Sequence, residues 1–137
     1  MTEQATLIDT NLIVYAHDQS AAPDKRKKAD ALIESLWGNG FVTVQILGEV
    51  YRVLAEKKKT DARQAADVVT DFSDGFTVLE TRKQDVRHAV RMACEKGVPI
   101  FDALIASTAM RHGVYRILTE DVNGFSKIKE LNVQNPL

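Results

Sequence analysis

Short apolar segments alternate along this chain with longer segments in which apolar residues recur at helical spacing. The short segments predict strands over residues 6–8, 41–44, 76–79 and 115–119, with a weak fifth strand over 132–134. The longer segments predict helices over residues 25–37, 44–57, 60–72, 81–97 and 102–112. Strands that alternate with helices form a parallel sheet covered on both faces. We therefore expect an α/β fold, a three-layer α/β/α sandwich whose central sheet has four to five mainly parallel strands.

Residues at the ends of these segments support the boundaries. Thr43 is placed to cap the helix that starts at residue 44, and Thr81 with Gln84 forms a capping-box pattern. Thr60 is expected to open the helix 60–72. Residues 12–15 are also mainly apolar, like those of the first strand.

Size and composition indicate one folded domain. The chain has 137 residues, and no linker, repeat or low-complexity tract divides it, so we expect a single domain over residues 1–137. Hydrophobic residues make up 45% and charged residues 27%, which excludes a disordered chain. The longest charge-poor stretch has 13 residues, 98–110, and contains Asp102. It is too short and too polar to span a bilayer, so no membrane partner is expected.

The single cysteine and the first residues bear on the cellular compartment. Cys94 has no partner for an internal disulfide, which favours a reducing cytoplasm and argues against a cysteine-based zinc site. Its place in a predicted helix suggests a small core residue. The N-terminal residues lack a basic region followed by an apolar core, so no signal peptide is expected. The formal net charge of −1 predicts neither a nucleic-acid-binding protein nor a membrane protein by itself.

Four acidic residues stand where strands end or helices begin. Asp9 follows the first strand, Asp121 follows the strand 115–119, Asp102 opens a helix, and Glu49 lies one turn into another helix. Because parallel sheets bind ligands beyond the carboxyl ends of their strands, these carboxylates are expected to converge on one cleft. Clustered carboxylates repel one another unless a cation lies between them, and Mg²⁺ and Mn²⁺ prefer such oxygen ligands.

Each acid also has a purely structural interpretation. Asp9 can cap the turn that follows it, and Asp102 can cap its helix. Asp121 lies in a run of turn-forming residues, and Glu49 shares a helical stripe with other polar residues, as on a solvated face. The order and spacing of all four, rather than any one of them, indicate a site.

Four segments that contain these acids resemble a known family. They are LIDTN at 7–11, VTVQILGEV at 42–50, FDALIA at 101–106 and LTED at 118–121, ahead of Phe125. In this order they resemble the PIN domain, and specifically the VapC-like toxins of type II toxin–antitoxin modules. The resemblance covers nearly the whole chain.

The resemblance implies a ribonuclease that depends on Mg²⁺ or Mn²⁺ and cleaves RNA phosphodiester bonds with a metal-activated water. The matching catalytic and metal-binding residues are Asp9, Glu49, Asp102 and Asp121, with Asp9 and Asp102 as the firmest ligands. The matching residues that would orient the carboxylates or water are Thr10, Asn11 and Thr119. Whether Glu120 shares the role of Asp121 stays open.

The resemblance also implies partners: an RNA substrate, a cognate antitoxin protein and a second copy of the chain. A homodimer is favoured further by the helical segments 29–37 and 50–54, which carry more large apolar residues than one sheet face needs.

Two basic runs are candidate contacts for an RNA backbone. The first consists of Lys25, Arg26, Lys27 and Lys28, and the second spans residues 57–59. Both runs are also typical of solvated helix ends. The three histidines, at 17, 88 and 112, are scattered and are expected to be structural or on the surface.

Two other functions compete with a nuclease. A receiver-type phosphoacceptor also clusters acids at strand ends, but it would need a phosphoacceptor Asp after a central strand and a Lys late in the sheet. Here the third strand ends at Leu79 and Glu80, and the fourth leads to acids. The second alternative is a PIN-fold protein that binds or processes RNA outside a toxin module. An intact set of four acids argues against a purely non-enzymatic role.

Overall fold

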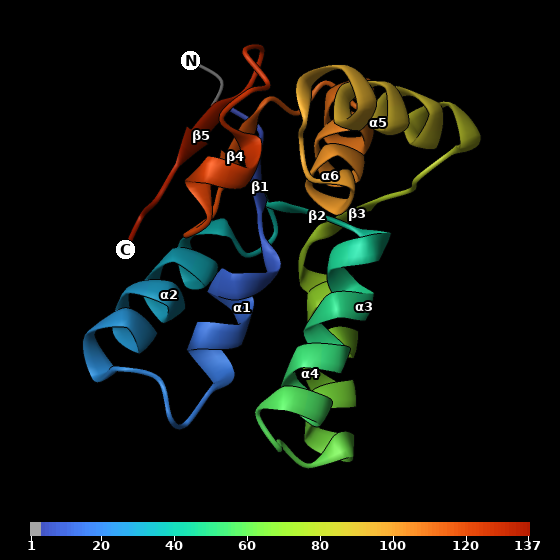
Figure 1. Cartoon of the computed structure of the whole chain (residues 1–137). Helices are drawn as coiled ribbons and strands as arrows, with labels where there is room; N and C mark the ends of the chain where they lie inside the picture. Colours follow the sequence, from blue (N-terminus) through green and yellow to red (C-terminus); the bar gives the residue numbers. More distant parts are fainter. Residues whose placement is uncertain (1–3) are drawn as a thin grey trace.

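The computed structural model describes residues 4–137, and a sheet of five parallel strands lies at its centre (Figure 1). The strands are β1 (Thr6–Ile8), β2 (Phe41–Thr43), β3 (Thr77–Leu79), β4 (Arg116–Leu118) and β5 (Asn132–Gln134). Their order is β3-β2-β1-β4-β5, and every neighbouring pair is parallel. The predicted parallel sheet is confirmed, including its weak fifth strand. All carboxyl ends therefore lie along one edge, with β1 in the middle.

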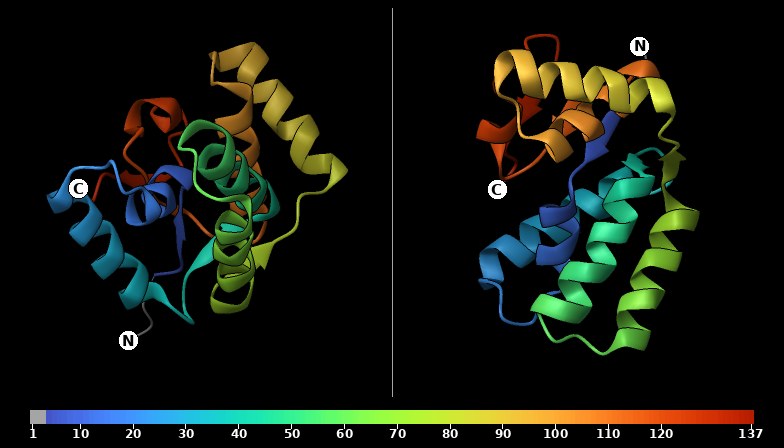
Figure 2. Two further views of the ribbon diagram at one scale, coloured as in Figure 1. Left: turned by 90° about the horizontal axis from the view of Figure 1, so that it is seen from below. Right: turned by 45° about the vertical axis from the view of Figure 1, so that its right-hand side comes forward.

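Helices cover both faces of this sheet, as the sequence pattern predicts. They are α1 (Thr10–His17), α2 (Pro23–Leu36), α3 (Val44–Arg52), α4 (Ala62–Gly75), α5 (Lys83–Lys96) and α6 (Ile100–Arg111). A π-helical turn, η1 (Val53–Lys57), extends α3, and a 3₁₀ turn, η2 (Val122–Phe125), follows β4. Helices α5 and α6 pack together on one face, whereas α1 to α4 lie on the other (Figures 1 and 2). Within residues 4–137, no helix has the length and apolar character needed to cross a membrane.

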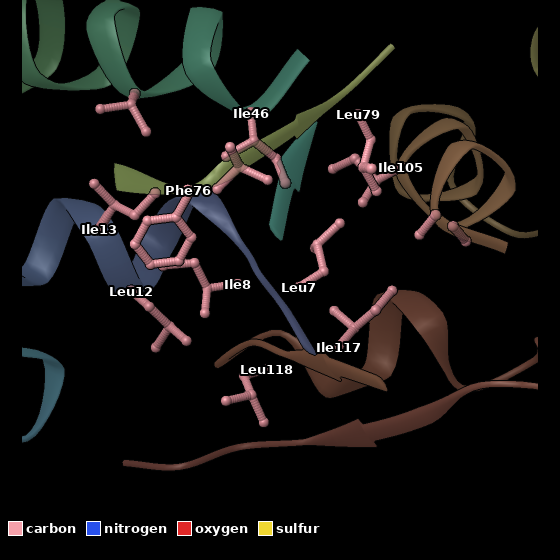
Figure 3. Packing of buried hydrophobic residues seen from close by; sticks show 14 of the residues in the cluster. Leu7, Ile8, Leu12, Ile13, Ile46, Phe76, Leu79, Ile105, Ile117 and Leu118 are labelled. Carbon is pink, nitrogen blue, oxygen red and sulfur yellow. The ribbon is translucent and has the colours of Figure 1, made fainter. Parts of the chain in front are cut away.

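The core forms because successive strand residues point to opposite faces. Leu7 points toward Ile105 of α6, whereas Ile8 lies beside Leu12 and Ile13 of α1 (Figure 3). All five are essentially inaccessible to solvent. Burial on both faces explains why the strands read as uninterrupted apolar runs.

Helix α1 contains the apolar residues 12–15, which the sequence pattern alone did not assign to a helix. The chain turns at Asp9, whose side chain caps the helix by accepting a hydrogen bond from the Thr10 N–H at 2.8 Å. Because α1 is packed between the sheet and its neighbouring helices, consecutive residues from Leu12 to Val14 are all buried. With three consecutive apolar residues buried, the sequence lacks the alternation of apolar and polar residues at helical spacing that identifies a surface helix.

Four expectations are wrong in detail. Helix α6 begins at Ile100 with Pro99 at the cap position, so Asp102 does not cap it. The side chain that turns back at the start of α5 is Asp85, which accepts the Arg82 N–H at 2.8 Å, in place of the expected Thr81 and Gln84. Asp61, not Thr60, caps α4. Cys94 is exposed and is not a core residue. The predicted cap at Thr43 is confirmed, since its hydroxyl accepts the Ile46 N–H.

Much of the apolar surface of α2 and α3 is used inside the chain. Val50 and Leu54 are buried, and the half-exposed Trp37 packs edge-on against Phe72 and Phe76 at centroid distances of 5.4 and 5.7 Å. The excess of large apolar residues that favoured a dimer from the sequence is therefore largely accounted for by this aromatic cluster and the core.

Two glycines give a matched test of this packing. A Cβ at buried Gly40 would overlap the Phe76 ring and lie 3.1 Å from Leu36 Cβ, so Gly40→Ala should lower the free energy of unfolding by about 1–3 kcal/mol. Gly48 lies inside α3 with open space around it, so Gly48→Ala should raise that free energy by about 0.5–1 kcal/mol. Urea unfolding of both variants measures the difference. Equal effects of the two changes would contradict the tight packing at Gly40.

Candidate active site

Four elements bring the four predicted acids to one cavity at the carboxyl edge of the sheet. Asp9 follows β1, Asp121 follows β4, and α3 carries Glu49 inward after β2. Helix α6 leads into the parallel strand β4 from the same edge, which places Asp102 there in its first turn. The cavity has a volume of about 310 Å³, and all four acids line it together with Thr10 and Asn11.

Asp9 is the most deeply placed of the four acids, with 6% of its surface exposed. Its Oδ1 accepts the Thr10 N–H at 2.8 Å, and its Oδ2 accepts the Thr119 hydroxyl at 2.9 Å. Burial raises the pKa of Asp9 above its usual value, and the charges of Glu49 and Asp121 add to this rise. The hydrogen bonds from Thr10 and Thr119 offset part of it. Asp9 is thus held rigidly while its negative charge is left poorly compensated.

Thr119 joins the ends of the two central strands. Besides donating to Asp9, its hydroxyl oxygen accepts the Asn11 side-chain amide at 3.1 Å and the Asp121 backbone N–H at 3.0 Å. The side-chain Oδ1 of Asn11 accepts the Glu120 backbone N–H at 3.1 Å. Asn11 and Thr119, which do not carry charge, therefore fix the position of Asp9 relative to Asp121.

Glu49 faces the cavity and is held through both of its carboxylate oxygens. Oε2 accepts the Thr10 hydroxyl at 2.9 Å, and Oε1 accepts the Gln45 amide at 2.7 Å. The same Gln45 nitrogen also donates to the Phe101 carbonyl at 3.2 Å. Gln45 thereby connects Glu49 to the start of α6, next to Asp102.

Asp102 also has a perturbed carboxylate. Within residues 4–137 its side chain makes no hydrogen bond, so nothing there compensates its charge. Burial, followed by the charges of Asp9, Asp121 and Glu49, raises the pKa of Asp102 to about 6. The three neighbouring acids contribute to the shift because like charges nearby disfavour the ionised form.

Asp121 lies opposite Asp102 across Gly124. Asp121 is exposed, and its Oδ1 accepts the Gly124 N–H at 3.4 Å at the start of η2. A Cβ at Gly124 would overlap Asp102 Oδ2 and lie 2.9 Å from Asp121 Oδ2. The missing side chain at Gly124 therefore leaves the space in which these two carboxylates approach each other.

The donor set of the cavity consists of carboxylate, hydroxyl and amide oxygens, which suit hard cations such as Mg²⁺. Among the described residues, no three Asp, Glu, His or Cys side chains are arranged to ligate one ion. Proteins commonly hold Mg²⁺ through only one or two carboxylates, with water completing the shell. The cavity fits that kind of binding.

Glu120 does not line the cavity, unlike its neighbour Asp121. Its two oxygens accept the Tyr15 hydroxyl at 2.6 Å and the Lys25 ammonium at 2.8 Å. These hydrogen bonds, from Lys25 first, hold the pKa of Glu120 below its usual range. Lys25 also lies 5.2 Å from the centre of the Tyr15 ring, and Tyr15 itself lines the cavity. Glu120 thus positions Tyr15, which lines the cavity.

The first basic run lies outside the cavity, at the start of α2. Lys25 is paired with Glu120, Arg26 donates to Gln19 at 3.4 Å, and Lys28 donates to the Leu137 carbonyl at 3.0 Å. Lys27 is exposed. Among the described residues that line the cavity, the one basic side chain is Lys58, from the second run.

Three residues that shape the cavity did not emerge from the sequence as site residues: Tyr15, Gln45 and Gly124. Gln45 had a usable signal, because it precedes Glu49 by one helical turn. Gly124 had none, since its role depends on contact with a distant helix.

Comparison with known proteins gives one family and a consistent fold. The sequence model of the PIN domain matches residues 6–131. No curated protein matches the sequence. The DNA-bound VapBC structure from Salmonella typhimurium is similar with a TM-score of 0.74 and 17% identity, covering 98% of this chain and 100% of that one.

Two further structures show the same fold. FitAcB from Neisseria gonorrhoeae has a TM-score of 0.72 and 20% identity, covering 96% of this chain and 97% of that one. VapC20 from Mycobacterium tuberculosis, described as a toxin that cleaves the sarcin–ricin loop, has a TM-score of 0.71 and 15% identity, covering 89% and 94%. At these identities the likeness establishes the fold.

Proposed function

The chain belongs to the PIN domain family, and we propose that it is a metal-dependent ribonuclease whose active site is formed by Asp9, Glu49, Asp102 and Asp121. The observation that carries this proposal is that all four carboxylates, from four separate elements, line one cavity at the carboxyl edge of the sheet. Holding four acids together costs stability, so their convergence is explained best by a cation that binds among them. The single domain is proposed to span residues 1–137.

Asp9 and Asp102 would hold a Mg²⁺ or Mn²⁺ ion, with Glu49 and Asp121 completing the set. When bound, such an ion neutralises phosphate charge and lowers the pKa of a water molecule at the scissile bond. Asp102 fits this role because its carboxylate has no competing hydrogen bond among the described residues. Asp9 fits it because Thr10 and Thr119 fix its orientation.

The uncharged residues around the acids would keep the site preorganised. Thr10 orients both Asp9, through its N–H, and Glu49, through its hydroxyl. Asn11 and Thr119 tie the loop after β1 to the loop after β4. These contacts would hold the acids in place before RNA arrives, and their loss is expected to reduce activity without removing it.

The wider role proposed for this nuclease is that of a toxin in a type II toxin–antitoxin module. Its support is that structures with the same fold include toxin–antitoxin complexes, among them one from Klebsiella pneumoniae with a TM-score of 0.72. The partners would be an RNA substrate and a cognate antitoxin protein. Membership of the PIN domain family argues against the receiver-type alternative. A PIN protein that processes RNA outside a toxin module remains the second candidate.

The test of the proposed activity is cleavage of RNA by the purified chain. Structured and unstructured RNA should be cut with millimolar Mg²⁺ or Mn²⁺ and left intact with EDTA. Expression of the chain in bacteria, with and without the product of the neighbouring gene, separates the two candidates. Growth arrest that the neighbouring product relieves supports the toxin, whereas RNA cleavage without arrest supports an RNA-processing enzyme.

A homodimer is also proposed, with α3 and the start of α6 as the surface to examine. Val44 and Phe101 there are 52% and 64% exposed. Sedimentation at high micromolar concentration should give twice the monomer mass. A monomer under those conditions would contradict the dimer and leave the nuclease proposal untouched.

A further inference from the structure

The cavity that holds the acids continues along α1 toward Lys58. On the α1 side it is lined by Asn11, Val14 and Asp18, which recur at helical spacing. On the opposite side it is lined by Glu49, Val53 and Lys58 from α3 and the turn that extends it. Helix α1 packs beside α3 (Figure 2). The cavity thus has an acidic end and a basic end, separated by the length of α1.

The π-helical turn η1 selects which lysine reaches this cavity. In a continuous α-helix, residues 49, 53 and 57 share one face, so Lys57 would follow Val53. Here the Lys58 N–H donates to the Val53 carbonyl at 3.0 Å, a hydrogen bond that spans five residues. The wider turn shifts the pattern by one residue, so that Lys58 lines the cavity and Lys57 does not. Single π-helical turns of this kind occur frequently at functional sites.

Lys58 forms an ion pair with Asp18 that it can leave. Its ammonium lies 3.2 Å from Asp18 Oδ2, and 39% of its side chain is exposed. The negative charge of Asp18 does not depend on Lys58 for stabilisation, because Asp18 Oδ1 accepts both the N–H and the hydroxyl of Ser20, at 2.9 and 2.6 Å. Hydrogen bonding by Ser20 is also the main reason why the pKa of Asp18 is low. Asp18 therefore stays ionised and satisfied when Lys58 turns to another anion.

We propose that Lys58 binds a backbone phosphate of the RNA strand at the basic end of the cavity, while the scissile phosphate lies at the acids. This inference rests on the proposed nuclease function. Asp9 and Asp18 cap the two ends of α1, so the ends of the cavity are about 13 Å apart at 1.5 Å per residue. That length corresponds to roughly two to four nucleotides of a single strand. Lys58 would thus position the strand and would not contact the reacting atoms.

The experiment measures binding of a fluorescein-labelled single-stranded RNA of about 12 nucleotides, in Ca²⁺, over a range of salt concentrations. Lys58→Gln should weaken binding about fivefold and reduce the slope of log K against log salt by about 0.7, the loss of one phosphate contact. Lys57→Gln removes the same charge from the adjacent exposed position and should change binding less than twofold. Lys58→Arg should retain wild-type binding. Asp18→Asn, which frees Lys58, should tighten it.

Length dependence adds a second readout. A dinucleotide spans only the acidic end, so Lys58→Gln should not change its cleavage in Mn²⁺, although it should raise the KM for the longer RNA. Equal losses in Lys57→Gln and Lys58→Gln, or an unchanged salt slope in Lys58→Gln, would overturn the phosphate site. Wild-type protein that fails to bind the RNA would overturn it as well. Binding that depends on Lys58 without any cleavage would instead contradict the nuclease and leave the phosphate site standing.

Discussion

Replacing Asp102 with Asn should reduce RNA cleavage by about 10³-fold and, in the absence of metal, make the protein more stable. The loss of activity follows because Asn cannot supply the negative charge that binds and orients a cation at the scissile phosphate. The gain in stability follows because the wild-type carboxylate is half-buried, has no hydrogen-bond partner among residues 4–137, and lies near three other negative charges. Asn has nearly the same shape and removes that repulsion.

The stability gain should depend on pH in a defined direction. The pKa of Asp102 is raised to about 6 in the folded chain, against 3.8 for an unperturbed side chain. A raised carboxylate pKa means that the protonated form is favoured by folding, so its contribution is present below pH 3.8 and is lost as the pH rises through 6. The advantage of Asn should therefore grow between pH 4 and 7 and level off above. Because the carboxylate is only half-buried, we expect about 0.5–2 kcal/mol at pH 8.

Thermal unfolding of the two proteins in EDTA and in millimolar Mn²⁺ measures the gain in stability without metal and the loss of metal binding. Mn²⁺ should raise the melting temperature of wild type more than that of Asp102→Asn, since a ligand that binds the folded state more tightly stabilises it more. A role as helix cap is already contradicted by Pro99 at the cap position. An identical Mn²⁺ shift in both proteins would show that the acids do not form one metal site.

The position of the acids could be predicted from the sequence because topology alone determines it. Parallel strands place Asp9 and Asp121 at the same edge of the sheet whatever the details of packing. Glu49 and Asp102 follow because the helices that carry them start at that edge. No accurate side-chain geometry is needed for this argument, only the order of strands and helices.

Other features could not be predicted because they depend on contacts between distant segments or on single hydrogen bonds. Helix α1 is surrounded by the protein, so Leu12 and Ile13 look the same in a helix as in a buried strand. The π-helical turn moves Lys58 into the cavity through one shifted hydrogen bond, which leaves the hydrophobic pattern unchanged. The pairing of Lys25 with Glu120 joins residues from α2 and the loop after β4. Neither a run of basic residues nor the spacing of its members in the sequence distinguishes such a paired lysine from a free one.

Gly124→Ala should reduce RNA cleavage by about 10²-fold in a protein that still folds. The new methyl group would overlap Asp102 Oδ2 and lie 2.9 Å from Asp121 Oδ2, so at least one carboxylate must move. A displacement of about 1 Å at a reacting centre costs an enzyme about this much. Gly124 belongs to the 3₁₀ turn η2 and has no left-handed backbone conformation that would require glycine. The backbone should therefore accept Ala, and the effect should come from the displaced acids.

Two controls separate displacement of the acids from a loss of stability. Gly48→Ala adds the same methyl group next to Glu49 but in open space, and it should retain wild-type cleavage. In the Asp102→Asn background, Gly124→Ala should cause little further loss, because the two changes act on the same carboxylate and their effects are not additive. Cleavage rates of the wild type and the four variants, together with their Mn²⁺-induced melting shifts, measure this directly. Full activity in Gly124→Ala would contradict the prediction and show that cleavage does not need the close approach of Asp102 and Asp121 at Gly124.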